Sequence, residues 1–124
     1  MIEGLRTVIY KVPDLESARS WYARVLGIEP YFAEPFYVGF RVGGFELGLD
    51  PDMEEGGRPG EGMVAYWGVA DAETEYARLT KGGATPHAPP RDVGGGIVVA
   101  TVKDPFGNVF GIIQNPHFSL ADVR

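Results

Sequence analysis

Val12-Pro13-Asp14-Leu15-Glu16-Ser17 returns 57 residues later in the chain as Val69-Ala70-Asp71-Ala72-Glu73-Thr74. Tyr22-Ala23-Arg24-Val25 is likewise echoed by Tyr76-Ala77-Arg78-Leu79, at an offset of 54 residues. The shorter second offset indicates that the second copy has lost about one helical turn. Two related halves therefore follow one another. Because a duplicated unit places equivalent residues around one pseudo-symmetric cleft, we expect the functional site there.

Each echo marks a strand that gives way to a helix. In the first half, Leu5 to Val12 alternates as a half-buried strand does, and Asp14 is placed to cap the helix that follows. Gly27 is placed to end that helix in the left-handed conformation. Two further strands are predicted at Phe36 to Val42 and Phe45 to Leu49. The residues expected in the core of this half are Leu15, Ala18, Trp21, Tyr22, Val25, Phe36, Val38, Phe40, Val42, Phe45, Leu47 and Leu49.

The second half repeats the same order of elements. A strand at Met63 to Val69 precedes a helix from Ala72 to about Lys81, and Ile97 to Lys103 and Val109 to Gln114 form a last hairpin. Thr85 to Gly96, between helix and hairpin, is rich in proline and glycine and is predicted to be a loop.

Composition restricts the class of protein. The chain has 124 residues, enough for one domain with a sizeable core. Acidic residues outnumber basic ones by 17 to 11 and no Lys/Arg-rich run occurs, which argues against nucleic acid as a partner. No apolar stretch suits a signal peptide or a membrane span, so we expect a cytoplasmic protein without a membrane partner. The absence of cysteine excludes disulfides, thiolate metal sites and a cysteine nucleophile.

Two motifs make the chain similar to a known family. Val12-Pro13-Asp14-Leu15, followed by Trp21-Tyr22 and Val25-Leu26-Gly27, lies in the first half, and Asp104-Pro105-Phe106-Gly107-Asn108-Val109-Phe110 lies in the second. In these segments the chain resembles the vicinal oxygen chelate superfamily, which includes glyoxalase I, bleomycin-resistance proteins, fosfomycin-resistance enzymes and extradiol dioxygenases.

The resemblance implies an α+β fold in which two tandem βαβββ modules form a curved, incompletely closed mixed sheet around a cleft. It also favours a homodimer. We expect a single domain over residues 1–124, with module one at about 1–50, a linker at 51–62, module two at about 63–115 and a tail at 116–124. The linker is rich in glycine and acidic residues, so it cannot contribute to a core.

Metal-dependent relatives carry four ligands on the first and last strand of each module. The resemblance places these ligands at Thr7, Glu46, Val64 and Gly111 of this chain. Only Glu46 retains a strong donor, whereas divalent metals need three or more. We therefore expect no metal ion and no other cofactor. The two histidines, His87 and His117, fall in a predicted loop and a predicted tail, and we expect them to be solvent-exposed rather than metal ligands.

Strand alternation, anchored at these four positions, predicts which residues line the cleft. Glu46 lies on the face opposite Phe45, Leu47 and Leu49, either as a base or cation-binding carboxylate or as an ordinary solvated glutamate. The candidate ligand-binding residues are Thr7, Ile9, Tyr37, Arg41, Glu46, Tyr66, Thr101 and Ile113.

The resemblance and the missing donors favour a metal-independent small-molecule-binding protein of the glyoxalase/bleomycin-resistance type. Glu46 and the aromatic faces of Tyr37 and Tyr66 suit a small organic ligand that is cationic or aromatic. The alternative is a glyoxalase-like lyase or isomerase that uses Glu46 as general base, with hydrogen bonds from Thr7, Arg41 or Tyr66 in place of a metal. A third hypothesis is a vestigial cleft whose architecture serves association with another protein. The sequence does not choose among these, and it does not identify the ligand.

Overall fold

The computed structural model describes residues 1–53, 62–103, 105 and 108–119. Most of the predicted linker and most of the turn after Lys103 lie outside the described residues. The chain divides into two compact units. The first unit contains Thr7–Val64 with Ser119, and the second contains Met1–Arg6 and Ala65–Phe118.

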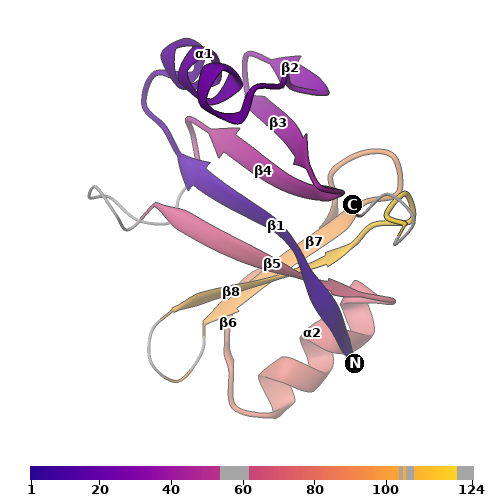
Figure 1. Ribbon diagram of the computed structural model, residues 1–124. Coiled ribbons are helices and arrows are strands. Elements are labelled where there is room, and N and C mark those ends of the chain that lie inside the picture. The colour runs from indigo at the N-terminus through magenta and orange to yellow at the C-terminus, as the bar shows by residue number, and fades with distance from the viewer. Residues whose placement is uncertain (54–61, 104, 106–107, 120–124) are drawn as a thin grey trace. The chain divides into compact units, whose positions relative to one another are not determined.

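The first unit is a four-stranded sheet with one helix packed on it (Figure 1). Its elements are β1 (Ile2–Lys11, which begins in the second unit), α1 (Leu15–Leu26), β2 (Phe32–Glu34), β3 (Tyr37–Val42) and β4 (Phe45–Asp50). The strand order is β2-β3-β4-β1, and β1 is parallel to β4 while the other neighbours are antiparallel.

Local chemistry fixes the ends of α1 as the sequence predicts. The Asp14 side chain accepts a hydrogen bond from the Ser17 backbone N–H at 3.1 Å. Gly27 takes a φ of 71° and its N–H donates to the carbonyl of Ala23. Because a left-handed residue costs glycine little, the helix ends there.

The second unit repeats this plan. Its elements are β5 (Met63–Val69, which begins in the first unit), α2 (Ala72–Lys81), β6 (Thr85–Asp92), β7 (Val98–Lys103) and β8 (Val109–Gln114). The strand order is β5-β8-β7-β6, with β5 parallel to β8. Together the two units confirm the predicted mixed α+β class and the βαβββ order of each module.

The prediction of a loop over Thr85 to Gly96 is wrong, because most of this segment is strand β6. Pro86, Pro89 and Pro90 lack the backbone N–H of a paired strand, which is why the sequence favours a loop here. An edge strand pairs on one side only, so it tolerates residues that have no N–H. The pairing of β6 with β7 shifts register between Pro86 and Ala88 and again between Ala88 and Arg91, which accommodates the prolines.

Each unit has its own core under its helix. In the first, Val38, Phe40 and Leu49 are buried against α1. The residues packed around them include Leu15, Ala18, Tyr22 and Leu47, as predicted. In the second unit the buried cluster is Val69, Ala72, Ala100 and Ile112, with Tyr76 and Leu79 of α2 packed on it.

Four residues predicted to be in the core are exposed instead. Phe36 is 60% exposed, Trp21 49%, Val42 40% and Phe45 39%. Val42 and Phe45 are paired at the hairpin end of β3 and β4, and α1 packs on Val38, Phe40 and Leu49 instead. Trp21 packs edge-on against Tyr22, with ring centroids 4.8 Å apart, rather than into the cluster.

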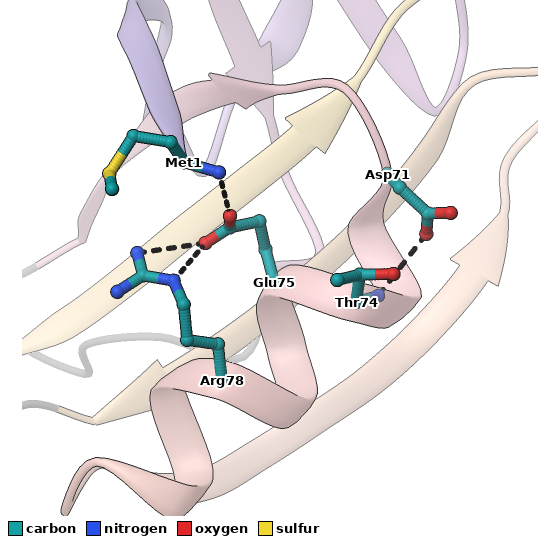
Figure 2. A network of polar contacts seen from close by, with 5 residues as sticks. All are labelled: Met1, Asp71, Thr74, Glu75 and Arg78. Carbon is teal, nitrogen blue, oxygen red and sulfur yellow. Dashed lines mark hydrogen bonds and ion pairs between the residues drawn. The ribbon is translucent and has the colours of Figure 1, made fainter.

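Glu75 of α2 is the centre of a polar network (Figure 2). Its side chain is only 4% exposed, and it pairs with the amino group of Met1 and with Arg78, whose nitrogen lies 2.9 Å away. The hydrogen bond from the Met1 amino group, followed by that from Arg78, lowers the pKa of the Glu75 carboxyl. The network ties the start of β1 to α2.

Among the described residues, neither helix has the length and apolar character needed to cross a membrane.

Candidate functional site

The predicted site residues of the first module gather on the sheet face that points away from α1. Thr7 pairs with Glu46 across β1 and β4, and Arg41 pairs with Glu46 across β3 and β4. The same registers place Ile9 beside Gly48, and Gly48 beside Gly39. Since side chains alternate along a strand, these residues and Tyr37 share a face, while Phe40 and Leu49 face the helix.

Glu46 is held by three hydroxyl groups. The carboxylate oxygen Oε2 accepts hydrogen bonds from Tyr31 at 2.6 Å and from Tyr37 at 3.0 Å. The other oxygen, Oε1, accepts a longer bond of 3.4 Å from Thr7. The side chain is half-buried, so it is neither a core residue nor a freely solvated one. The carboxylate is therefore held in place by protein hydroxyl groups rather than by solvent alone.

Two glycines make room for this arrangement. A Cβ at Gly39 would lie 2.6 Å from Oε2 of Glu46 and 3.0 Å from Cε1 of Tyr31. A Cβ at Gly48 would lie 2.7 Å from Cζ of Tyr37. Because these two paired residues have no Cβ, the side chains of Tyr31 and Tyr37 have room to lie above them and reach the Glu46 carboxylate.

Tyr31 is a site residue that the sequence did not reveal. It lies in a bend just before β2 and is 54% exposed, yet its hydroxyl makes the shortest of the three bonds to Glu46. Partial burial, together with this hydrogen bond and the negative charge of Glu46, raises the pKa of the Tyr31 phenol. The phenol therefore stays a hydrogen-bond donor at neutral pH.

Arg41 adds a positive charge beside the negatively charged Glu46. Its guanidinium carbon lies 4.9 Å from the centre of the Tyr31 ring, within the range of a cation–π contact. Within the described part of the chain Arg41 has no ion pair, although it is directly opposite Glu46 in the sheet. We call Thr7, Tyr31, Tyr37, Arg41 and Glu46 the carboxylate cluster.

The predicted site residues of the second module also share one face. Tyr66 pairs with Gly111, which in turn pairs with Thr101, and Ile113 lies two residues along β8. The Tyr66 ring lies over Gly111, where an added Cβ would be 2.6 Å from Cδ1 of the ring. Thr101 is 3% exposed and Ile113 is 7% exposed, so these two side chains offer little surface to a ligand.

His87 lies on a strand, which corrects the prediction that it occupies a loop away from the sheet. Its Nδ1 is 2.8 Å from the Thr101 hydroxyl oxygen. The register shift of β6 between Pro86 and Ala88 falls at this residue, and such irregularities redirect a side chain. The ring is exposed, as expected, and its Nδ1 is within hydrogen-bond distance of the Thr101 hydroxyl.

His117 follows β8, outside the strands, as predicted. Its Nε2 lies 2.8 Å from the carbonyl oxygen of Gly95. Gly94, Gly95 and Gly96 all have positive φ, and this contact ties their turn to the segment after β8. His117 therefore has a structural partner at that turn.

The four positions that the resemblance assigns to metal ligands, Thr7, Glu46, Val64 and Gly111, offer only one strong donor side chain, the Glu46 carboxylate. The Thr7 hydroxyl is engaged with Glu46, and the Tyr66 ring fills the space beside Gly111. Val64 has no donor atom. Over the described ranges no three histidine, aspartate or glutamate side chains come together as a metal-binding group. Divalent metals in such sites require at least three donors.

Comparison with known proteins gives a family and a fold. Residues 4–112 match the family described as the Glyoxalase/Bleomycin resistance protein/Dioxygenase superfamily. A structure of that superfamily from Vibrio splendidus 12B01 shares 22% identity at a TM-score of 0.67, covering 90% of this chain and 99% of its own. A curated protein of similar sequence was not found.

Two further solved structures have the same fold. A Streptomyces coelicolor methylmalonyl-CoA epimerase variant in complex with 2-nitronate-propionyl-CoA has a TM-score of 0.78 at 17% identity, covering 96% of this chain and 99% of its own. A protein described as an NAD-dependent benzaldehyde dehydrogenase from Legionella pneumophila has a TM-score of 0.67 at 18% identity, covering 86% and 96%. At these identities the likeness concerns the fold alone.

Proposed function

We propose that this chain, which belongs to the Glyoxalase/Bleomycin resistance protein/Dioxygenase superfamily, binds a small organic molecule without the help of a metal ion. The observation that carries the proposal is the environment of Glu46, whose carboxylate accepts hydrogen bonds from the hydroxyl groups of Tyr31 and Tyr37. A polar anchor among aromatic rings is the usual composition of a small-molecule site.

The surroundings of Glu46 favour a cationic or aromatic ligand. A carboxylate attracts a ligand N–H, and the tyrosine rings offer apolar and π surface beside it. Phe32 extends the aromatic surface, because its ring centroid lies 6.2 Å from that of Tyr37. The Glu46 carboxylate and the rings of Tyr37 and Phe32 together can orient a small molecule.

Thermal unfolding in the presence of a compound library, with and without a chelator, tests the proposal. A ligand at one hundred times its Kd adds about 2.7 kcal/mol to the free energy of unfolding, which is easily detected. We expect hits whose protection survives chelation and falls in Glu46→Gln and Tyr37→Phe. Glu29→Gln, an exposed charge change after α1, is the matched control. Protection that requires an added divalent metal would contradict the proposal.

A second candidate function is catalysis by Glu46 as general base, in a lyase or isomerase reaction of glyoxalase type. It is favoured by the orientation of the carboxylate through Tyr31 and Tyr37, since a base must be held within hydrogen-bond reach of the proton that it removes. The fold is shared with an epimerase. Turnover of a bound compound that Glu46→Gln abolishes while binding persists would support catalysis, and binding without turnover by either protein would support the first function.

A further inference from the structure

Arg41 and Glu46 have opposite charges and face each other across β3 and β4, yet they do not form an ion pair. Directly opposed residues of an antiparallel pair have Cβ atoms about 5 Å apart, so side chains as long as these can meet.

Tyr31 is the group between them. Its hydroxyl donates a hydrogen bond to Oε2 of Glu46 at 2.6 Å, and the guanidinium carbon of Arg41 lies 4.9 Å from the centroid of its ring. The space for this ring exists because residue 39 is glycine, since a Cβ there would come within 3.0 Å of the Tyr31 ring. One phenol therefore contacts both charges and keeps them separate.

Both charges remain accessible. Arg41 is exposed and Tyr31 is 54% exposed, while Glu46 is half-buried. A carboxylate has about four positions at which it can accept a hydrogen bond, and the three hydroxyls occupy three of them. A ligand ammonium can therefore donate to Glu46 and to a phenol oxygen, while a ligand carboxylate can accept from the guanidinium fork of Arg41.

We propose that the carboxylate cluster binds a small zwitterion, an amino acid or similar molecule whose ammonium group meets Glu46 and whose carboxylate meets Arg41. The inference rests on the proposed binding function and adds the chemical class of the ligand. Tyr31 acts in it as a spacer that prevents the two protein charges from neutralising each other.

The test is a set of three probes of similar size: γ-aminobutyrate, butylammonium and butyrate. Their affinities are measured at neutral pH by NMR titration of the intact protein. We expect γ-aminobutyrate to bind about tenfold more tightly than either singly charged probe, because a charge-assisted hydrogen bond supports a difference of that size.

Two variants assign the charges. Arg41→Gln should remove the advantage of γ-aminobutyrate over butylammonium and leave the affinity for butylammonium unchanged. Glu46→Gln should remove its advantage over butyrate in the same way. Arg24→Gln, in the last turn of α1, and Glu29→Gln are the matched controls, and both should bind as the parent protein does.

A third variant tests the spacer. Tyr31→Ala should let Arg41 and Glu46 pair, and should therefore weaken γ-aminobutyrate about tenfold while the fold, followed by circular dichroism, is retained. Equal affinities of the three probes, no binding of γ-aminobutyrate, or an unchanged affinity in Arg41→Gln would overturn the inference. The library experiment decides separately whether the protein binds small molecules, so the two failures are distinguishable.

Discussion

The two modules use the same packing device with opposite results. In each, a tyrosine ring lies over a glycine of the neighbouring strand: Tyr37 over Gly48 in the first unit and Tyr66 over Gly111 in the second. In the first unit the phenol is thereby delivered to the Glu46 carboxylate. In the second, Tyr66 pairs with Gly111 as Ile9 pairs with Gly48 in the first, so Gly111 corresponds to Gly48 and the counterpart of Glu46 is Val109, two residues earlier on β8. The two units keep the same strand pairing, but the first has the carboxylate of Glu46 where the second has the apolar side chain of Val109.

The largest difference should come from filling the two glycine sites. In Gly111→Ala the new Cβ meets the base of the Tyr66 ring, 2.6 Å from Cδ1 and 2.9 Å from Cγ, which the side chain cannot easily move. In Gly48→Ala the Cβ meets the outer end of Tyr37, which can swing aside. We expect Gly111→Ala to lower the free energy of unfolding by about 1–3 kcal/mol and Gly48→Ala by less. Urea unfolding measures both.

The background variant Tyr66→Ala is the control for this clash. The cost of Gly111→Ala should largely disappear in it, because the ring that the new methyl group meets is gone. If Gly111→Ala costs the same in both backgrounds, the ring is not what constrains this position.

The two helices also differ at equivalent positions. Ala18 of α1 packs against the core of its unit, whereas Glu75, 57 residues later, binds the Met1 amino group and Arg78. Because Glu75 is almost fully enclosed, Glu75→Gln leaves these cations without a counter-charge. We expect the variant to lose about 1–2 kcal/mol of unfolding free energy at neutral pH.

The effect of Glu75→Gln on the free energy of unfolding should depend on pH. The pKa of Glu75 is lowered in the folded protein, so the carboxylate stabilises the fold at every pH above its unfolded pKa of about 4.3. That stability is lost as the pH falls from this value through the folded pKa. The difference between the parent protein and Glu75→Gln should therefore shrink in acid. A difference that is constant from neutral pH to acid would show that the charge of Glu75 does not matter.

Local signals were sufficient for the helices and for the face of Glu46. The Asp14 cap depends on Ser17, three residues away, and the side on which Glu46 lies follows from strand periodicity alone. Tyr31 could not be found this way, because it lies outside any periodic segment and meets Glu46 only when β3 and β4 pair. The sequence alone does not place His87 on a strand, because its neighbouring prolines are compatible with strand structure only at a sheet edge, and the edge position is a property of the folded sheet.

The two buried threonines provide the smallest contrast. Thr101 is 3% exposed and lies 2.8 Å from His87 Nδ1, whereas Thr7 is 5% exposed but its bond to Glu46 is 3.4 Å long. Valine replaces the hydroxyl of either by a methyl group of similar size. We expect Thr101→Val to cost about 1 kcal/mol of unfolding free energy and Thr7→Val to cost about half of that or less, because a long hydrogen bond contributes little. Chemical denaturation measures both, and Thr80→Val in α2 serves as a control in which a hydroxyl bound to backbone is lost. A larger cost for Thr7→Val would mean that Thr7, rather than the two tyrosines, is the principal support of the carboxylate.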